Sequence, residues 1–232
     1  LSLSTACDEA WVAAFSQGLA HDQSLFDCHL IGGDTTRTLG PLSITITIFG
    51  FAPTSALLLR SGAQADQTIY VSGSIGDASI GLRLLQHPNG VLPAYGNIAK
   101  ERYHLPQPRL ALGQSLVGVA SACMDISDGL VQDLEHLCRA SHVGADIHLP
   151  RIPMIGGETL SDETRALLAT SGDDYELLFT APQSATDMII ALADSLGIAV
   201  TAIGHTTAQH GVRVLDATGQ EKILTQKGYQ HA

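Results

Sequence analysis

Short strand-like and helix-like segments interleave irregularly along this chain of 232 residues. Apolar residues alternate with Ser and Thr over residues 42–48, which is the period-2 pattern of a strand with one buried face. Trp11, Phe15 and Leu19 recur at the spacing of an amphipathic helix. Several strand-like segments lie too close together for a helix to connect them. The sequence therefore predicts an α+β fold, with mixed sheets and helices packed on their faces.

The same patterns predict the bounds of individual elements. Residues 8–21 predict a helix that begins with a capping box at residues 5–8. An apolar run at 28–31 predicts a strand, and Pro108 is expected in the first turn of a helix, because proline fits position N1. The other predicted elements are strands at 67–71, 174–180 and 199–204, helices from 77, at 98–103, from 130 and at 185–196, and a hairpin turn at 216–219.

The charge balance limits what the chain can bind. It has 12 Lys and Arg against 23 Asp and Glu, a formal net charge of −11, whereas a general nucleic-acid surface needs basic patches. A phosphate ligand would therefore need metal ions to supply positive charge. The sequence has no run of about 18 apolar residues, so no membrane span is expected. Four cysteines without a Cys-x-x-Cys pair, and no secretory pattern, predict a cytoplasmic protein.

A loop at residues 60–62 separates two parts of the sequence. We expect residues 1–58 to belong to one domain and residues 59–232 to form a second, α/β domain. The chain begins Leu-Ser-Leu-Ser without an initiator Met, so we expect it to start partway into a longer protein.

Residues 32–36, Gly-Gly-Asp-Thr-Thr, follow the strand predicted at 28–31. Their glycines let a backbone approach a ligand closely, and the Asp34 carboxylate with the neighbouring hydroxyls suits Mg²⁺. An Asx or ST turn explains the same residues, and on residue types alone the turn is favoured.

Asp125 and Asp128 lie three residues apart before the helix predicted from 130, where Ser127 can cap and the two acids can face the same way. Acids near a helix N-terminus complement its dipole, so capping explains one of them. Two acids would repel each other unless a cation lay between them. Capping and metal binding are therefore weighted equally.

Two further segments join strands to polar turns. Residues 171–176, Ser-Gly-Asp-Asp-Tyr-Glu, place three acids within four positions, and a solvated turn is slightly favoured over a ligand site. Residues 72–77, Ser-Gly-Ser-Ile-Gly-Asp, resemble a phosphate-cradling turn before a helix. They match neither the P-loop nor the dinucleotide fingerprint, so a structural turn is favoured there.

Taken in order, these segments resemble the thiamine-monophosphate kinase family, which is related to aminoimidazole ribonucleotide synthetase and similar ATP-binding enzymes. The segment Asp-Ile-Ser-Asp-Gly is also similar to relatives in purine and selenophosphate synthesis. Ser-Gly-acid-Asp-Tyr-Glu-Leu, together with the ending Lys-Gly-Tyr, points to the thiamine enzymes in particular. The resemblance covers essentially the whole chain, and the matching segments are residues 30–37, 60–63, 125–130, 171–177 and 227–229.

The resemblance implies a two-domain, aminoimidazole ribonucleotide synthetase-like architecture whose first domain pairs in a homodimer. It implies a cytoplasmic kinase that uses ATP and several Mg²⁺ ions to convert thiamine monophosphate into thiamine diphosphate, by direct in-line transfer without a general base. Where this chain has Asp173, the family more often has Glu. The implied ligands are Gly33, Asp34, Arg60 and Ser127 for ATP, Asp34, Asp125 and Asp128 for magnesium, and Asp173 and Tyr229 for thiamine monophosphate.

The family also carries metal and substrate segments before the helix that opens this chain, namely Gly-x-Gly-Asp-Asp, Ser/Thr-Thr-Asp and an Asn-Leu-Ser-Asp helix. None of them occurs in this sequence. We therefore expect an incomplete first domain and an inactive chain when it is alone. Two alternatives stay open: a nucleotide- or metal-binding fragment without turnover, and an ATP-dependent synthetase of purine or selenophosphate metabolism.

Overall fold

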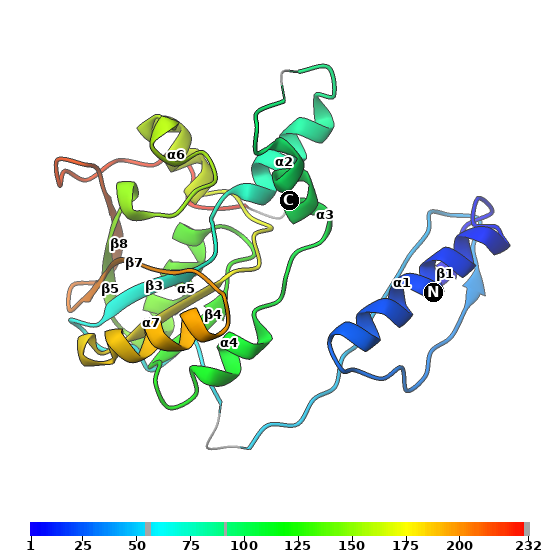
Figure 1. Ribbon diagram of the computed structural model, residues 1–232, viewed down its shortest axis with the longest axis horizontal. Helices are drawn as coiled ribbons and strands as arrows, with labels where there is room; N and C mark the ends of the chain where they lie inside the picture. Colours follow the sequence, from blue (N-terminus) through cyan, green and yellow to red (C-terminus); the bar gives the residue numbers. More distant parts are fainter. Residues whose placement is uncertain (54–56, 91, 230–232) are drawn as a thin grey trace. The chain divides into compact units, whose positions relative to one another are not determined.

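The computed structural model describes residues 1–53, 57–90 and 92–229, apart from the side chain of Glu158. It divides into two compact units, Leu1–Phe51 and Ala52–Ala232, whose helices and strands are shown in Figure 1. None of the helices in the described part is long and apolar enough to cross a membrane. The predicted division of the chain into domains 1–58 and 59–232 stays a prediction.

The first unit contains one long helix and one short parallel strand pair. Helix α1 (Glu9–Leu25) is four residues longer at its end than predicted. Its N-cap is Asp8, whose carboxylate accepts a hydrogen bond from Trp11 N at 2.8 Å, so the capping box predicted from residue 5 is wrong. Strand β1 (Ser2–Leu3) pairs with β2 (Thr36–Arg37).

Two strands predicted in the first unit do not form. Residues 28–31 have no strand, and residues 42–48 make only an isolated bridge between Ser2 and Ser43. The alternating apolar side chains stay exposed, Ile44 at 42% and Ile48 at 83%. A strand is stable only when its backbone pairs with a neighbour and its apolar face packs. Within residues 1–51, the Ser2–Ser43 bridge is the only pairing of this segment, so the period-2 pattern does not form a strand.

The second unit is built on a six-stranded mixed sheet in the order β4-β6-β3-β7-β5-β8. All neighbours are antiparallel except β5 and β8, which are parallel. This confirms the predicted α+β fold with a mixed sheet. The strands are β3 (Thr68–Ser72), β4 (Ala122–Asp125), β5 (Gly144–His148), β6 (Leu177–Ala181), β7 (Val200–Thr207) and β8 (Gly211–Leu215).

Six α-helices accompany this sheet in the described residues. Helix α4 begins at Leu110 with Arg109 as its N-cap, so Pro108 precedes the cap and the N1 prediction is wrong. The predicted turn at 216–219 forms, with Asp216 N donating to Gln220 O at 2.9 Å. The helices are α2 (Asp77–Gln86), α3 (Gly96–His104), α4 (Leu110–Ser115), α5 (Leu130–Ser141), α6 (Asp162–Ala169) and α7 (Thr186–Ser195).

Alternate residues of β3, β4 and β6 pack into different cores on the two faces of the sheet. Ile69 and Val71 of β3 join the core that contains α5, whereas Tyr70 between them joins the core that contains α4 and α7. Strands β4 and β6 are antiparallel, with Asp125 opposite Leu177. The segment that leaves β4 and the segment that enters β6 therefore meet at one edge of the sheet, where several predicted site residues lie.

Candidate active site

A buried carboxylate holds the loop at 126–129 that joins β4 to α5. Asp133 Oδ2 accepts hydrogen bonds from the backbone N–H groups of Ser127, Asp128 and Gly129 at 3.0, 3.0 and 3.1 Å. Burial raises the pKa of Asp133, and the three donors oppose that rise. Gly129 is the N-cap of α5 and no side chain caps it, so the prediction that Ser127 caps this helix is wrong. The loop is held instead by the carboxylate of Asp133, which is a residue of α5.

Residues 171–176 run beside this loop and extend the β4–β6 pairing. Asp173 N donates to Ser127 O at 2.9 Å, and Tyr175 N donates to Ile126 O at 2.8 Å. A Cβ at Gly172 would lie 2.3 Å from the Ser127 carbonyl oxygen, so only glycine allows this close approach. The two predicted segments therefore form one backbone-bonded unit.

Asp173 and Tyr175 are exposed and have left-handed backbone conformations, with φ of 71° and 51°. Such conformations cost non-glycine residues on the order of 1–3 kcal/mol each and persist only where neighbours hold them. The residues that alternate with them, Asp174 and Glu176, are bonded into the fold. Strained residues between anchored ones are typical of binding and catalytic sites.

Asp174 is anchored at the first turn of α2. Its carboxylate accepts hydrogen bonds from Gly76 N at 2.7 Å and Ala78 N at 3.3 Å. Burial raises the pKa of Asp174 to about 8, although these two donors act in the opposite direction. The helix amides that could hold a phosphate at residues 72–77 are therefore occupied by a carboxylate of this chain. This agrees with the prediction that residues 72–77 form a structural turn.

Glu176 is anchored by a buried ion-pair cluster. Arg109 donates from Nε to Oε2 at 2.7 Å and from Nη2 to Oε1 at 2.5 Å, and Arg102 Nη1 donates to Oε1 at 3.2 Å. Ser72 Oγ donates to Oε2 at 2.5 Å. The hydrogen bonds with Glu176 raise the pKa of Arg109, because they favour its charged form. This cluster ties the start of β6 to β3 and to the segment before α4.

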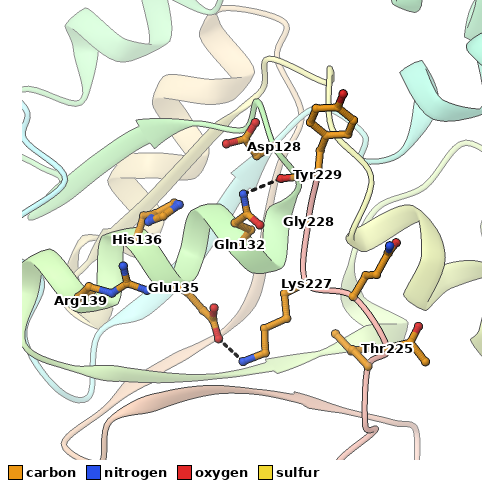
Figure 2. A pocket seen from close by; sticks show the side chains of 11 residues that line it. Asp128, Gln132, Glu135, His136, Arg139, Thr225, Lys227, Gly228 and Tyr229 are labelled. Atoms are coloured by element: carbon orange, nitrogen blue, oxygen red, sulfur yellow. Dashed lines mark hydrogen bonds and ion pairs between the residues drawn. The ribbon is translucent and has the colours of Figure 1, made fainter. Parts of the chain in front are cut away.

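A cavity of about 1070 Å³ lies between α5 and the C-terminal segment, as Figure 2 shows. At one end of it, Tyr229 N donates to Asp128 O at 2.8 Å, and Gln132 Nε2 donates to Tyr229 O at 3.0 Å. Lys227 forms an ion pair with Glu135 towards the other end. The C-terminal segment therefore places Tyr229 beside the loop that carries Asp128.

A second cavity, of about 550 Å³, lies between α4 and the start of β6. Tyr175 and Leu177 line it, together with Asp125, the last residue of β4. Asp125 and Asp128 therefore line different cavities and do not share the first turn of a helix. Burial raises the pKa of Tyr175, and the charges of Asp173, Asp125 and Asp128 raise it further, because these carboxylates lie around the phenol.

The structure brings five of the predicted site residues to this edge of the sheet: Asp125, Ser127, Asp128, Asp173 and Tyr229. Arg60 is exposed, and its carbonyl accepts a hydrogen bond from Ser141 Oγ at 3.2 Å, at the end of α5 remote from the loop. Gly33 and Asp34 belong to the first unit. There Asp34 Oδ1 accepts a hydrogen bond from Thr35 N at 2.8 Å in an exposed turn.

A group of three side chains is close enough to hold a cation. One ligand atom each from Asp128, Asp133 and His136 lies within 4.8 Å of the others. Oδ2 of Asp133 already accepts hydrogen bonds from three backbone N–H groups. Carboxylate oxygens are the ligands that Mg²⁺ prefers.

Residue patterns missed two groups that shape the site, Asp133 and Arg109. Asp133 lies on α5, a few residues after the loop, and its position on the buried helix face was a usable signal, because an unpaired acid rarely occupies a core position. Arg109 meets Glu176 across 67 residues, and no local pattern indicates that contact.

Residues 64–217 match the family model of the AIR synthase related protein C-terminal domain, and residues 1–52 match that of its N-terminal domain. The chain is 39% identical over 228 residues to thiamine-monophosphate kinase of Escherichia coli (strain K12), covering 97% of this chain and 70% of that protein. It is 36% identical over 231 residues to thiamine-monophosphate kinase of Caulobacter vibrioides, covering 97% of this chain and 64% of that protein.

Solved structures have the same fold. The crystal structure of thiamine-monophosphate kinase from Stenotrophomonas maltophilia K279a matches with a TM-score of 0.82 and 35% identity, covering 96% of this chain and 71% of that one. The structure of AaThiL complexed with AMPPCP and TMP matches with a TM-score of 0.76, covering 99% of this chain and 71% of that one. Its identity of 23% shows the fold alone. The predicted aminoimidazole ribonucleotide synthetase-like architecture is thus confirmed.

Proposed function

The chain belongs to the thiamine-monophosphate kinase family, and we propose that it serves the ATP-dependent phosphorylation of thiamine monophosphate to thiamine diphosphate. The observation that carries this proposal is the meeting of three segments at one edge of the sheet. Loop 126–129, residues 171–176 and Tyr229 are joined by backbone hydrogen bonds. Three of the family motifs thus meet in the second unit, although Tyr229 lies 100 positions after Gly129, the end of the loop.

The donor set fits magnesium. Asp128 lies in loop 126–129, whose amides Asp133 holds, and Asp125 is the last residue of β4, where it pairs with β6, so both backbone positions are fixed before any ligand binds. In a chain of net charge −11, bound Mg²⁺ would offset the negative charge of two phosphate groups. We propose that several Mg²⁺ ions bind, with Asp125 and Asp128 as magnesium ligands in the second unit and Asp34 as a magnesium ligand in the first.

The transfer needs no general base from the protein. The acceptor is a phosphate oxygen, which is largely ionised near neutral pH because its second pKa is about 6. Tyr175 stays protonated, since its pKa is raised, and can donate a hydrogen bond without taking up a proton. The residues therefore act by positioning the two substrates for direct in-line transfer, without a phosphorylated protein intermediate.

Each substrate is assigned to named residues. We propose that Asp173 and Tyr229 contact thiamine monophosphate and that Gly33, Asp34, Arg60 and Ser127 contact ATP. Asp173 is one methylene shorter than the Glu that the family more often has. The first unit is proposed to pair two copies of the protein in a homodimer, and the cytoplasm is proposed as its location.

Formation of thiamine diphosphate tests this proposal. The gene product is assayed with ATP, Mg²⁺ and thiamine monophosphate, and its rate is compared with those of the variants Asp125→Asn and Asp128→Asn. We expect each variant to lose about 100-fold or more in kcat, since each removes a charged ligand at the reacting phosphates. Asp187→Asn, an exposed acid in the first turn of α7, is the matched control and should keep full activity. Full activity of both loop variants would contradict the assigned metal ligands.

A further inference from the structure

The C-terminal strap, residues 224–229, crosses the surface of α5 without forming a helix or a strand. Its contacts with the helix run in reverse order, as Figure 2 shows: Lys227 forms an ion pair with Glu135, whereas Tyr229 is bonded to the earlier residue Gln132. The strap is therefore antiparallel to α5. Because it joins no sheet and no helix, contacts of this kind decide where it lies.

Gly228 brings the strap into direct contact with α5. It is buried, and a Cβ at this position would lie 2.5 Å from Gln132 Cβ and 2.8 Å from the carbonyl oxygen of Asp128. The backbone of Gly228 is not left-handed, so the requirement for glycine is one of space. Any side chain here would push the strap away from the helix, because a packed contact leaves no room for an added carbon.

The ion pair of Lys227 with Glu135 is the second contact. Glu135 lies on the polar face of α5, whose opposite face packs into the core through Leu134 and Leu137. The side chains of Lys227 and Glu135 are 53% and 22% exposed, and ion pairs at such exposure add little to stability. The pair still selects one position of an irregular segment, because Lys227 reaches Glu135 only when the strap lies along this face.

The next residue of the strap, Tyr229, is held by its backbone. Its N–H donates to Asp128 O at 2.8 Å, and its carbonyl accepts a hydrogen bond from Gln132 Nε2 at 3.0 Å. Its side chain is 60% exposed and lines the cavity along α5. A side chain carried on a fixed backbone binds a ligand at a lower entropy cost than one on a mobile segment.

Resting on the proposed function, in which Tyr229 contacts thiamine monophosphate, we propose that Lys227 and Gly228 are positioning residues. They fix the backbone of Tyr229 at the cavity and so set the affinity for thiamine monophosphate. Lys227 acts through its pair with Glu135, and its charge is not a ligand for a substrate phosphate. Neither residue contacts the reacting atoms, so the affinity changes while kcat does not.

Exchange of charges tests the role of Lys227. Lys227→Glu and Glu135→Lys each replace an attraction by a repulsion, and the double variant restores the pair with its charges exchanged. Lys222→Glu makes the same change five positions earlier, at the ion pair with Glu163. Lys222 does not line the cavity, so this variant is the matched control.

An added methyl group tests the role of Gly228. Gly228→Ala must lift the strap from α5, because its Cβ would overlap Gln132. Gly18→Ala is the matched control: Gly18 is exposed on α1, and nothing lies within 4 Å of a Cβ there.

The readouts are kcat, the KM for each substrate, and hydrogen exchange of the Tyr229 amide in the gene product. We expect Gly228→Ala to raise KM for thiamine monophosphate about 10-fold, and each single charge reversal to raise it about 5-fold. The double variant and both controls should stay within about 2-fold of the parent protein, as should kcat and KM for ATP throughout. The Tyr229 amide should exchange faster in the three variants that raise KM, and at the parent rate in the others.

Four results would overturn the proposal. They are an unchanged KM for thiamine monophosphate in Gly228→Ala and both single reversals, an equal rise in KM for ATP, a double variant no better than the single reversals, and an unchanged exchange rate of the Tyr229 amide. The third would make Lys227 a direct ligand. Thermal unfolding shows whether each variant folds, and if Gly228→Ala does not, the charge exchange decides.

Amide exchange needs neither substrate nor turnover. If the parent protein formed no thiamine diphosphate, the proposed function would fail, and the exchange rates would still show whether Lys227 and Gly228 hold Tyr229. The two failures are therefore distinguishable.

Discussion

Glu176 and Arg109 form a two-pronged ion pair that joins the start of β6 to the segment before α4. Arg109 donates to both oxygens of the Glu176 carboxylate, at 2.7 and 2.5 Å, and the Glu176 side chain is only 2% exposed. Because Asp173 and Tyr175 precede Glu176 in a strained stretch, this pair holds the segment that carries Asp173, which is proposed to contact thiamine monophosphate.

Removing Arg109 should destabilise the second unit. Arg109→Met leaves the Glu176 carboxylate buried with only part of its compensation, so we expect a loss of about 3 kcal/mol in the free energy of unfolding, measured in urea. Arg213→Met, at the exposed ion pair with Asp146, should lose much less, since solvent screens that charge. Equal losses in the two variants would contradict the structural role given to the buried pair.

Gly73 is required by the position of the Glu176 carboxylate. Gly73 and Gly197 have nearly the same φ, 58° and 64°, but a Cβ at Gly73 would lie 1.9 Å from Glu176 Oε1, whereas nothing lies within 4 Å at Gly197. Gly197→Ala should therefore lose only the cost of a left-handed alanine, about 1–2 kcal/mol. Gly73→Ala should lose about 1–3 kcal/mol more in the same unfolding measurement. Similar losses would mean that Glu176 moves aside freely.

Asp133 should control ligand binding by holding loop 126–129 in place. Asp133→Ala leaves three N–H groups of loop 126–129 without their acceptor, which should lower the free energy of unfolding by about 3 kcal/mol. Calorimetric titration with Mg²⁺ and ATP should show weaker binding, because Ser127 and Asp128 lose their fixed positions. Asp133→Asn keeps an acceptor oxygen and should recover part of both losses. If Asp133→Ala binds as tightly as the parent protein, the loop does not depend on this carboxylate.

Asp174 should make stability fall with rising pH. Its pKa is raised from an ordinary 3.8 to about 8 in the folded protein, so between these values the unfolded chain has lost a proton that the folded chain keeps. The contribution of Asp174 to stability is thus fully present below its unfolded pKa and is lost as the pH rises through about 8. Urea unfolding at a series of pH values should show this fall, and Asp174→Asn should reduce its slope. An unchanged slope in Asp174→Asn would assign the pH dependence to other groups, such as Asp77 and Asp133, whose pKa values are also raised.

The second unit was predictable because its signals are local. The apolar periods that predicted strands at 67–71 and 199–204 and helices from 77 and 130 match β3, β7, α2 and α5 closely. The strand predicted at 42–48 does not form. A period-2 pattern shows only which face could be buried, and within residues 1–51 the segment pairs only through the bridge between Ser43 and Ser2.

The candidate site was predictable only in part. Residue patterns indicated Asp125 and Asp128 as candidate ligands, because paired carboxylates suit a cation, and the family resemblance added Asp173 and Tyr229. The groups that hold them act across the chain: Arg109 reaches Glu176 over 67 residues and Asp174 reaches Gly76 over 98. Contacts at such separations follow from the fold, and single-sequence patterns do not encode them.

The most direct test of the account follows the transferred phosphate. The gene product is incubated with Mg²⁺, thiamine monophosphate and ATP labelled at the γ-phosphate. The reaction products and the protein are then both analysed for label. Direct in-line transfer predicts label in thiamine diphosphate, one molecule for each ADP formed, with none on the protein. Label trapped on the protein, or ADP formed without thiamine diphosphate, would contradict the account.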